Sequence, residues 1–169
     1  LVLLAESYTG YRNLLLLSSL GHMEGLHSGK PCISLDMLRR HHQHLIALSG
    51  CMGGEVPQYL SNGKTKEAAQ AAAAYADIFG PEHFYLELQD HPAIPGQLSV
   101  NTEMIQLSKD MGLPLVVTRD VHYLHPDDAD AQDILVCIGE GVKVADGHRQ
   151  TFRQVDRSLA PGDDIASRF

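Results

Sequence analysis

Leu113-Pro-Leu-Val-Val-Thr-Arg-Asp-Val-His-Tyr123 is the stretch that decides the fold. Its centre, Leu115–Val117, is a short apolar and partly β-branched run, and the Met-Gly pair before the stretch is typical of a helix end and a turn. Such a run between turn signals and charged residues predicts a buried parallel strand. Asp120 and His122 follow it, two residues apart, so an extended backbone would present both side chains on one face.

Asp120 and His122 form the first candidate site. In open α/β sheets and α/β barrels, sites are built at the carboxyl ends of parallel strands. A carboxylate and an imidazole placed there are two natural ligands of a metal ion. The simpler alternative, a turn aspartate and a surface histidine, stays open on spacing alone.

A second strand is predicted at Leu45–Leu48, and it ends in a glycine-rich turn that carries Cys51. The glycines of this turn permit positive φ angles and close backbone approach. The turn places Cys51 at the same sheet edge as the first candidate site, where a thiolate could join the other ligands around zinc or a similar ion. A small buried thiol is the alternative for Cys51 by itself.

The remaining sequence alternates between strands and helices. A buried strand is also expected at 1–5, and a further strand at 84–88. The expected helices are 11–20 capped by Thr9, one that begins after Ser34, 64–79 stopped by Gly80, one capped by Asn101 up to 111, one through 136, and a last one from 161. This alternation predicts parallel strands with right-handed crossovers, in a barrel or an open doubly wound sheet. The sequence contains neither the glycine motif of a Rossmann fold or P-loop nor a serine elbow. Nucleotide binding of those two kinds and catalysis by such a serine therefore have no support.

Three more candidate site groups, Glu87, Asp90 and His91, lie at the end of the strand expected at 84–88. For His91 we favour a substrate contact or a loop residue over a metal ligand. The segment after Val142 is polar and irregular.

Composition limits the functional classes. The net charge of −8 excludes a basic nucleic-acid clamp in this chain alone, so a larger protein would have to supply the positive surface for DNA. Three scattered cysteines fit a reducing cytoplasm. No apolar run approaches the ~20 residues that cross a bilayer. The chain opens with Leu1 inside an apolar run, so we expect a fragment that lacks upstream residues.

Several stretches, in this order, resemble one family: 3–6 with 10–14, 48–51 with 54–56, 84–91, and 118–124. Over residues 1–152 the chain is similar to the C-terminal part of the PHP (polymerase and histidinol phosphatase) domain of the bacterial family C replicative polymerases, the DNA polymerase III alpha subunits. Residues 153–169 are expected to begin the polymerase region that follows.

The resemblance implies an α/β fold: a partial, distorted (β/α)7 PHP-type barrel with parallel strands that lacks its N-terminal strands. The family's metal ligands match Cys51, Asp120 and His122 in this sequence. Its other ligands would precede Leu1, so we expect the fragment alone to be inactive. Arg119 stands where the family often has asparagine, and the stretch 153–159 departs most from the family, so we place no site there.

The resemblance also implies the function. The parent protein would be the bacterial replicative DNA-directed DNA polymerase, a nucleotidyltransferase whose catalytic carboxylates lie outside this chain. The PHP part would be a zinc- or manganese-dependent phosphoesterase with 3′–5′ exonuclease potential, or a structural platform, and magnesium would serve the parent polymerase. The implied partners are DNA, deoxynucleoside triphosphates, the sliding clamp and the proofreading subunit, in the cytoplasm and without a membrane.

Two alternatives compete with the replicative polymerase. One is a stand-alone metal-dependent PHP phosphoesterase, for instance a histidinol-phosphatase-like enzyme, and the other is a non-catalytic scaffold. The Gly-Tyr-Arg-Asn-Leu and Leu-Ser-Gly-Cys stretches favour the polymerase branch of the family.

Overall fold

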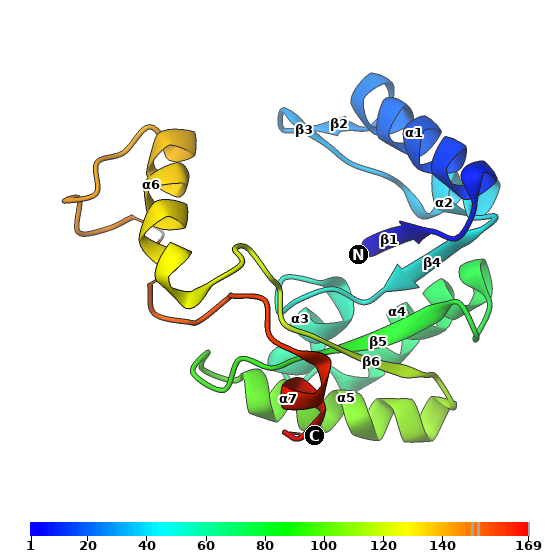
Figure 1. Ribbon diagram of the computed structural model, residues 1–169. Coiled ribbons are helices and arrows are strands. Elements are labelled where there is room, and N and C mark those ends of the chain that lie inside the picture. The colour runs from blue at the N-terminus through cyan, green and yellow to red at the C-terminus, as the bar shows by residue number, and fades with distance from the viewer. Residues whose placement is uncertain (150, 152, 169) are drawn as a thin grey trace. The chain divides into compact units, whose positions relative to one another are not determined.

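A computed structural model of the chain describes residues 1–149, 151 and 153–168 (Figure 1). Its main sheet has the strand order β1-β4-β5-β6, with the bounds β1 Val2–Ala5, β4 Leu45–Leu48, β5 Phe84–Gln89 and β6 Leu115–Thr118. β4 and β5 pair in parallel, with Ala47 opposite Phe84. Hydrogen bonds from Leu86 N to Pro114 O (2.9 Å) and from Asp90 N to Thr118 O (3.1 Å) extend the parallel arrangement to β6. The predicted α/β class with parallel strands is therefore confirmed, in a sheet that is open over the described residues.

The first strand runs in the other direction, which corrects the prediction that all the strands are parallel. β1 is antiparallel to β4, with Val2 opposite Leu48 and Ala5 opposite Leu45. The connection between them returns the chain to the end of the sheet at which β1 stops: Glu6 N donates to His44 O at 3.1 Å. A connection that returns to the same end produces an antiparallel pair, whereas a crossover to the opposite end would have produced a parallel one.

Burial also divides the strands. The central strands are buried, and Ala47, Phe84 and Leu86 have exposed fractions of 0%. The predicted burial of the other two strands is wrong: Leu4 in β1 is 48% exposed and Leu115 in β6 is 37% exposed. β1 and β6 stand at the two ends of the strand order, so each has a neighbouring strand of this sheet on one side only.

The helices cover most of the remaining chain. Their bounds are α1 Tyr8–Met23, α2 Leu35–His41, α3 Glu55–Ser61, α4 Thr65–Phe79, α5 Gln97–Met111, the 3₁₀ turn η1 Pro126–Asp128, α6 Ala129–Glu140 and α7 Gly162–Ala166, and the small hairpin β2 Leu26–His27 with β3 Lys30–Pro31 follows α1. None of the described helices has the length and apolar character that a membrane crossing requires.

Helix caps show where local sequence was sufficient. Ser34 caps α2 as predicted, and its hydroxyl accepts a hydrogen bond from Met37 N at 3.2 Å. Gly80 ends α4 with a φ of 86°, also as predicted. Thr9 is not a cap, because α1 begins earlier, at Tyr8, and its cap is Ser7, whose hydroxyl accepts from Gly10 N at 3.2 Å. Asn101 is likewise not a cap: it lies inside α5 and donates its amide to Gln89 O at 3.0 Å.

The chain forms two compact units, which are described separately. The first consists of Leu1–Glu87 with Glu103–Val116, and the second of Leu88–Thr102 with the chain from Val117 onward. In the first unit α3 packs against α4, α4 against β4, and α1 against β1 and α2. The predicted domain boundary at residue 152 lies outside the described residues and stays a prediction.

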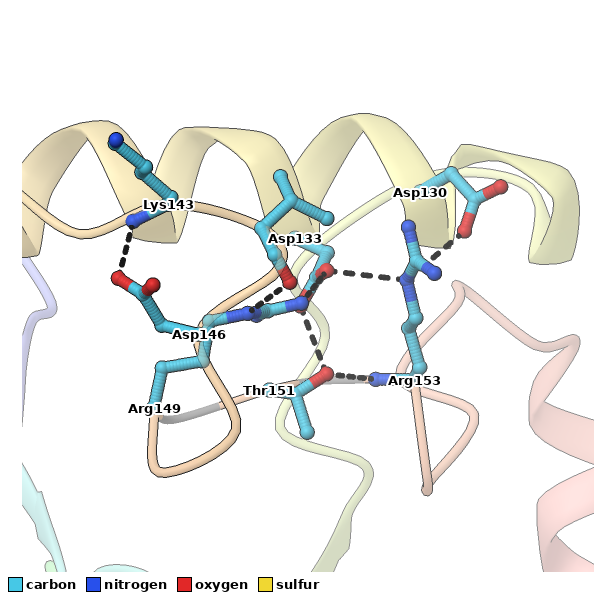
Figure 2. Close-up of polar contacts among 8 residues, drawn as sticks. Asp130, Asp133, Lys143, Asp146, Arg149, Thr151 and Arg153 are labelled. Carbon is cyan, nitrogen blue, oxygen red and sulfur yellow. Dashed lines mark hydrogen bonds and ion pairs between the residues drawn. The ribbon is translucent and has the colours of Figure 1, made fainter.

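In the second unit, an ion-pair cluster ties the irregular segment after Val142 to α6 (Figure 2). Asp133 of α6 has an exposed fraction of 0%. It accepts two hydrogen bonds from Arg149, at 2.7 and 2.6 Å, and one from the hydroxyl of Thr151 at 2.8 Å, and Arg153 Nε lies 3.0 Å away. The hydrogen bonds from Arg149 hold the pKa of Asp133 well below its usual range. The segment after Val142 is therefore held to α6 by the buried Asp133 carboxylate, although its sequence is polar.

Candidate metal centre

Cys51 lies in the turn between β4 and α3, in the first unit, and its side chain is exposed. The alternative of a small buried thiol is therefore wrong. Glu87 holds this turn from the neighbouring strand: its backbone N–H donates to the Ser49 hydroxyl at 2.8 Å, and its Oε2 accepts from Gly50 N at 3.1 Å. Glu87, a candidate site group in the sequence, is thus a buried residue that positions the turn carrying Cys51.

The glycines of this turn have the roles that the sequence predicted. Gly50 has a φ of 86°, in the left-handed region that favours glycine. Gly54 is needed for space, because a Cβ atom there would lie 2.2 Å from the Ser49 carbonyl oxygen. The turn is therefore fixed by backbone packing on one side and by the Glu87 carboxylate on the other.

Asp120 and His122 lie in the second unit, just after β6. The prediction that an extended backbone presents both side chains on one face is wrong. β6 ends at Thr118, and Asp120 has a φ of 48°, so the backbone is not extended between the two residues. They are instead brought together by a contact between the His122 ring and the Asp120 backbone. The His122 Nδ1 atom lies 2.6 Å from the backbone oxygen of Asp120 and 4.0 Å from its carboxylate Oδ1.

The short contact indicates which nitrogen of the His122 ring donates. A carbonyl oxygen only accepts hydrogen bonds, so Nδ1 is the donor in this contact, and in the tautomer with its hydrogen on Nδ1 the lone pair is on Nε2. Metal-binding histidines commonly have this arrangement, with one nitrogen anchored to a carbonyl and the other used as a ligand. Carboxylate oxygens are suitable second ligands. The donor chemistry of Asp120 and His122 therefore fits a divalent metal ion.

The Asp120 carboxylate already has a cationic partner, Arg157, whose guanidinium donates to Asp120 Oδ2. The backbone fixes Arg157 as well: its oxygen accepts from His122 N at 3.0 Å, and its N–H donates to the Tyr123 hydroxyl at 2.9 Å. Sequence reasoning placed no site in the stretch 153–159 and therefore missed Arg157. A cation in a stretch that departs from the family was the available signal.

His91 follows β5 and is a buried residue, with an exposed fraction of 2%. Burial, and then repulsion from Arg157, lowers its pKa, against opposing effects of a hydrogen bond to the Arg119 backbone and of the Asp120 and Asp90 carboxylates. Burial therefore favours the uncharged form of the ring. Among the described residues its Nε2 atom has no hydrogen-bond partner.

Two more ion pairs surround these residues in the second unit. Arg168 contacts Asp90 at 2.8 Å, and Arg119 contacts Asp156 at 2.6 Å. The backbone N–H of Ser158, together with its hydroxyl and Arg119, holds the pKa of Asp156 below its usual value. The arginine that replaces the family's asparagine thus has a defined partner in this chain.

The complete ligand set stays a prediction. Across residues 1–149, 151 and 153–168, no three histidine, cysteine, aspartate or glutamate side chains are grouped as a metal site. Asp120 and His122 form a pair in one unit, and Cys51 belongs to the other.

The open sheet with parallel central strands defines an α/β domain, and comparison with known families gives the family. Residues 1–91, more than half of the chain, match the model of the PHP domain. The chain belongs to the PHP domain family.

Curated relatives extend the similarity beyond residue 91. The chain is 38% identical over 169 residues to "DNA polymerase III subunit alpha" of Treponema pallidum, covering 100% of this chain and 14% of that protein. The proteins of the same name from Borreliella burgdorferi and Thermus aquaticus are 40% identical over 149 residues and 38% identical over 152 residues, covering 88% and 90% of this chain. The chain spans 14%, 13% and 12% of the length of these three relatives.

Proposed function

We propose that this chain is part of the PHP module of a bacterial replicative DNA polymerase, a DNA polymerase III alpha subunit. One observation carries the proposal: the similarity to such a subunit continues over all 169 residues, past residue 91 where the match to the PHP domain ends. A stand-alone phosphoesterase of the histidinol-phosphatase kind would share the PHP part only. The substrates of the whole protein would be DNA and deoxynucleoside triphosphates, and its partners the sliding clamp and the proofreading subunit, in the cytoplasm.

The gene itself tests this part of the proposal. We expect the reading frame to continue past residue 169 into a polymerase region with its own catalytic carboxylates. We also expect the purified gene product to extend a primed DNA template with deoxynucleoside triphosphates and magnesium. A stop codon shortly after residue 169 would eliminate the polymerase and leave the phosphoesterase.

We further propose that Cys51, Asp120 and His122 contribute ligands to a divalent metal site, with zinc or manganese as the ion. Two features support this role: the carboxylate of Asp120, and the His122 tautomer that its contact with the Asp120 backbone oxygen at 2.6 Å imposes. A bound divalent ion would act as a Lewis acid and lower the pKa of a bound water, which is the chemistry of phosphoester hydrolysis and of 3′–5′ exonuclease activity. Asp120 would supply negative charge, and His122 a neutral nitrogen donor.

Metal analysis of the whole polymerase subunit tests the ligand set. We expect Asp120→Asn and Cys51→Ser to reduce the zinc or manganese content, the first more than the second because a carboxylate can bridge two ions. Asp156→Asn is the matched control, since it changes another partly exposed aspartate of the same unit. Primer extension should be retained in all three variants.

An unchanged metal content in both ligand variants would favour the structural-platform role of the domain. Equal losses would leave the ligand set in place but contradict the greater weight given to Asp120.

A further inference from the structure

In the Asp120–Arg157 pair, the cation that contacts the carboxylate is a side chain of the same chain. The Arg157 side chain is 16% exposed and that of Asp120 is 32% exposed, so water screens the pair only in part. A hydrogen bond between a guanidinium and a carboxylate carries charge on both partners and is stronger than one between neutral groups. Asp120 is therefore electrically compensated by this chain alone.

The guanidinium does not reach Asp120 by a chance rotamer of a long surface side chain. Arg157 is paired through its own backbone with the segment that contains the second proposed ligand, since its oxygen accepts from His122 N at 3.0 Å. The next residue, Ser158, forms a parallel bridge with Tyr123, which follows His122 directly. Because the backbone is already ordered, only the side chain of Arg157 loses conformational freedom when it binds the carboxylate.

We propose that Arg157 is a built-in competitor for the metal ion, so that the Asp120 carboxylate binds either the guanidinium or a divalent cation. This inference rests on the proposed metal role of Asp120. A divalent ion on the same carboxylate would be repelled by the adjacent guanidinium at short range, which makes simultaneous binding unfavourable. Arg157 then sets the metal concentration at which this part of the site fills.

The size of the effect follows from competition. An intramolecular competitor lowers the apparent affinity for the metal by the factor 1 + K, where K is the equilibrium constant for pairing with the carboxylate. A charge-assisted hydrogen bond that is partly shielded from water gives a K of about ten. Removing Arg157 should therefore raise the apparent metal affinity about tenfold.

The test is a metal titration of the whole polymerase subunit after removal of metal with a chelator. Zn²⁺ is titrated against a chromophoric chelator, and Mn²⁺ binding is measured separately by electron paramagnetic resonance. Arg157→Met is compared with the control Arg168→Met. The control removes the same charge from the same C-terminal segment, but Arg168 is paired with Asp90 and not with Asp120. We expect about tenfold tighter binding for Arg157→Met and a change within about twofold for Arg168→Met.

Two results would overturn the proposal: no gain in affinity for Arg157→Met, or an equal gain in both variants, which would reflect charge alone. If Arg157→Met does not fold, as judged by circular dichroism, Arg157→Gln replaces it. That variant also removes the charge but keeps a polar side chain, so a gain of about tenfold is again expected, and no gain would again overturn the proposal.

Asp120→Asn separates this inference from the proposed function. If Asp120→Asn leaves metal binding unchanged, the proposed metal role of Asp120 itself fails. If Asp120→Asn abolishes binding and Arg157→Met gains nothing, the metal role stands and only the competition is wrong.

Discussion

Replacing Gly54 with alanine tests whether close backbone packing fixes the turn that carries Cys51. Gly54 has a φ of −70°, which any residue adopts, so the substitution introduces no backbone strain and only space matters. The added Cβ would lie 2.2 Å from the Ser49 oxygen and 3.1 Å from the Cys51 oxygen. The Ser49 backbone has little freedom to move, because its N–H donates to Tyr85 O at 2.9 Å in the β4–β5 pairing.

The expected loss of stability can be worked out from these contacts. Overpacking costs about 1–3 kcal/mol, and a clash of this depth against backbone atoms belongs at the upper end. Gly54 is also the N-cap of α3, where alanine is worse than glycine by up to about 1 kcal/mol. The sum, about 3–4 kcal/mol, is a large part of the about 5–15 kcal/mol that stabilises a typical domain. It corresponds to a fall in melting temperature of roughly 10 °C for a chain of this size.

Urea denaturation followed by circular dichroism measures this loss, with Gly53→Ala as the matched control in the same turn. A Cβ on Gly53 would meet only the Cys51 Sγ atom, at an ordinary contact distance of 3.7 Å. We expect the control to lose less than about 1 kcal/mol, as most substitutions free of a clash do. Equal losses in the two variants, or a loss below about 1 kcal/mol for Gly54→Ala, would show that the turn relaxes and would refute the reasoning.

Three further changes test other parts of the molecule. Asp133→Asn should lower the melting temperature at pH 7 and speed proteolysis of the segment after α6. Because the pKa of Asp133 is held below its unfolded value of about 3.9, the stability that its carboxylate contributes is present above about pH 4 and is lost as the pH falls toward the folded pKa. Thermal scans of the two proteins should therefore converge in acid. Tyr75→Phe removes a 2.7 Å hydrogen bond to Glu55 and should lower the free energy of unfolding by about 0.5–1.5 kcal/mol in urea denaturation. Burial, and then Glu55, raises the pKa of Tyr75, so this tyrosine does not contribute to the absorbance change near pH 10. The amplitude of an alkaline absorbance titration near pH 10 should therefore be the same with and without the substitution. Chelation of metal should shift the melting temperature by less than about 2 °C, since the guanidinium already compensates Asp120, whereas a structural zinc site would unfold.

The central part of the fold could be predicted because its signals are local. The strands predicted at 45–48 and 84–88 are short runs rich in apolar residues, and they are observed as the largely buried strands Leu45–Leu48 and Phe84–Gln89. The glycines after the strand at 45–48 predicted a turn that permits a positive φ, and Gly50 has one. Each of these features is decided by a few adjacent residues, so the sequence contains the information.

The direction of β1 and the geometry at Asp120 could not be predicted in the same way. The direction of β1 depends on where a connection of some forty residues returns to the sheet, which no local pattern contains. The positive φ of Asp120 replaced the extended backbone that the two-residue spacing assumed. The two proposed ligands are still adjacent, but through a positive φ at Asp120 and a contact of the His122 ring with the Asp120 backbone.

Long-range charge pairing explains why the contacts of the C-terminal segment could not be predicted. Three arginine–aspartate pairs join the residues after β5 and β6 to this segment: Arg119–Asp156, Asp120–Arg157 and Asp90–Arg168. The partners are 37, 37 and 78 residues apart, so no sequence window shows them together. Every carboxylate in these pairs has a cation supplied by the fold, so these three aspartates need no metal charge to compensate them. A metal at Asp120 would then serve chemistry rather than folding, and its binding would have to displace an interaction that the folded chain already makes.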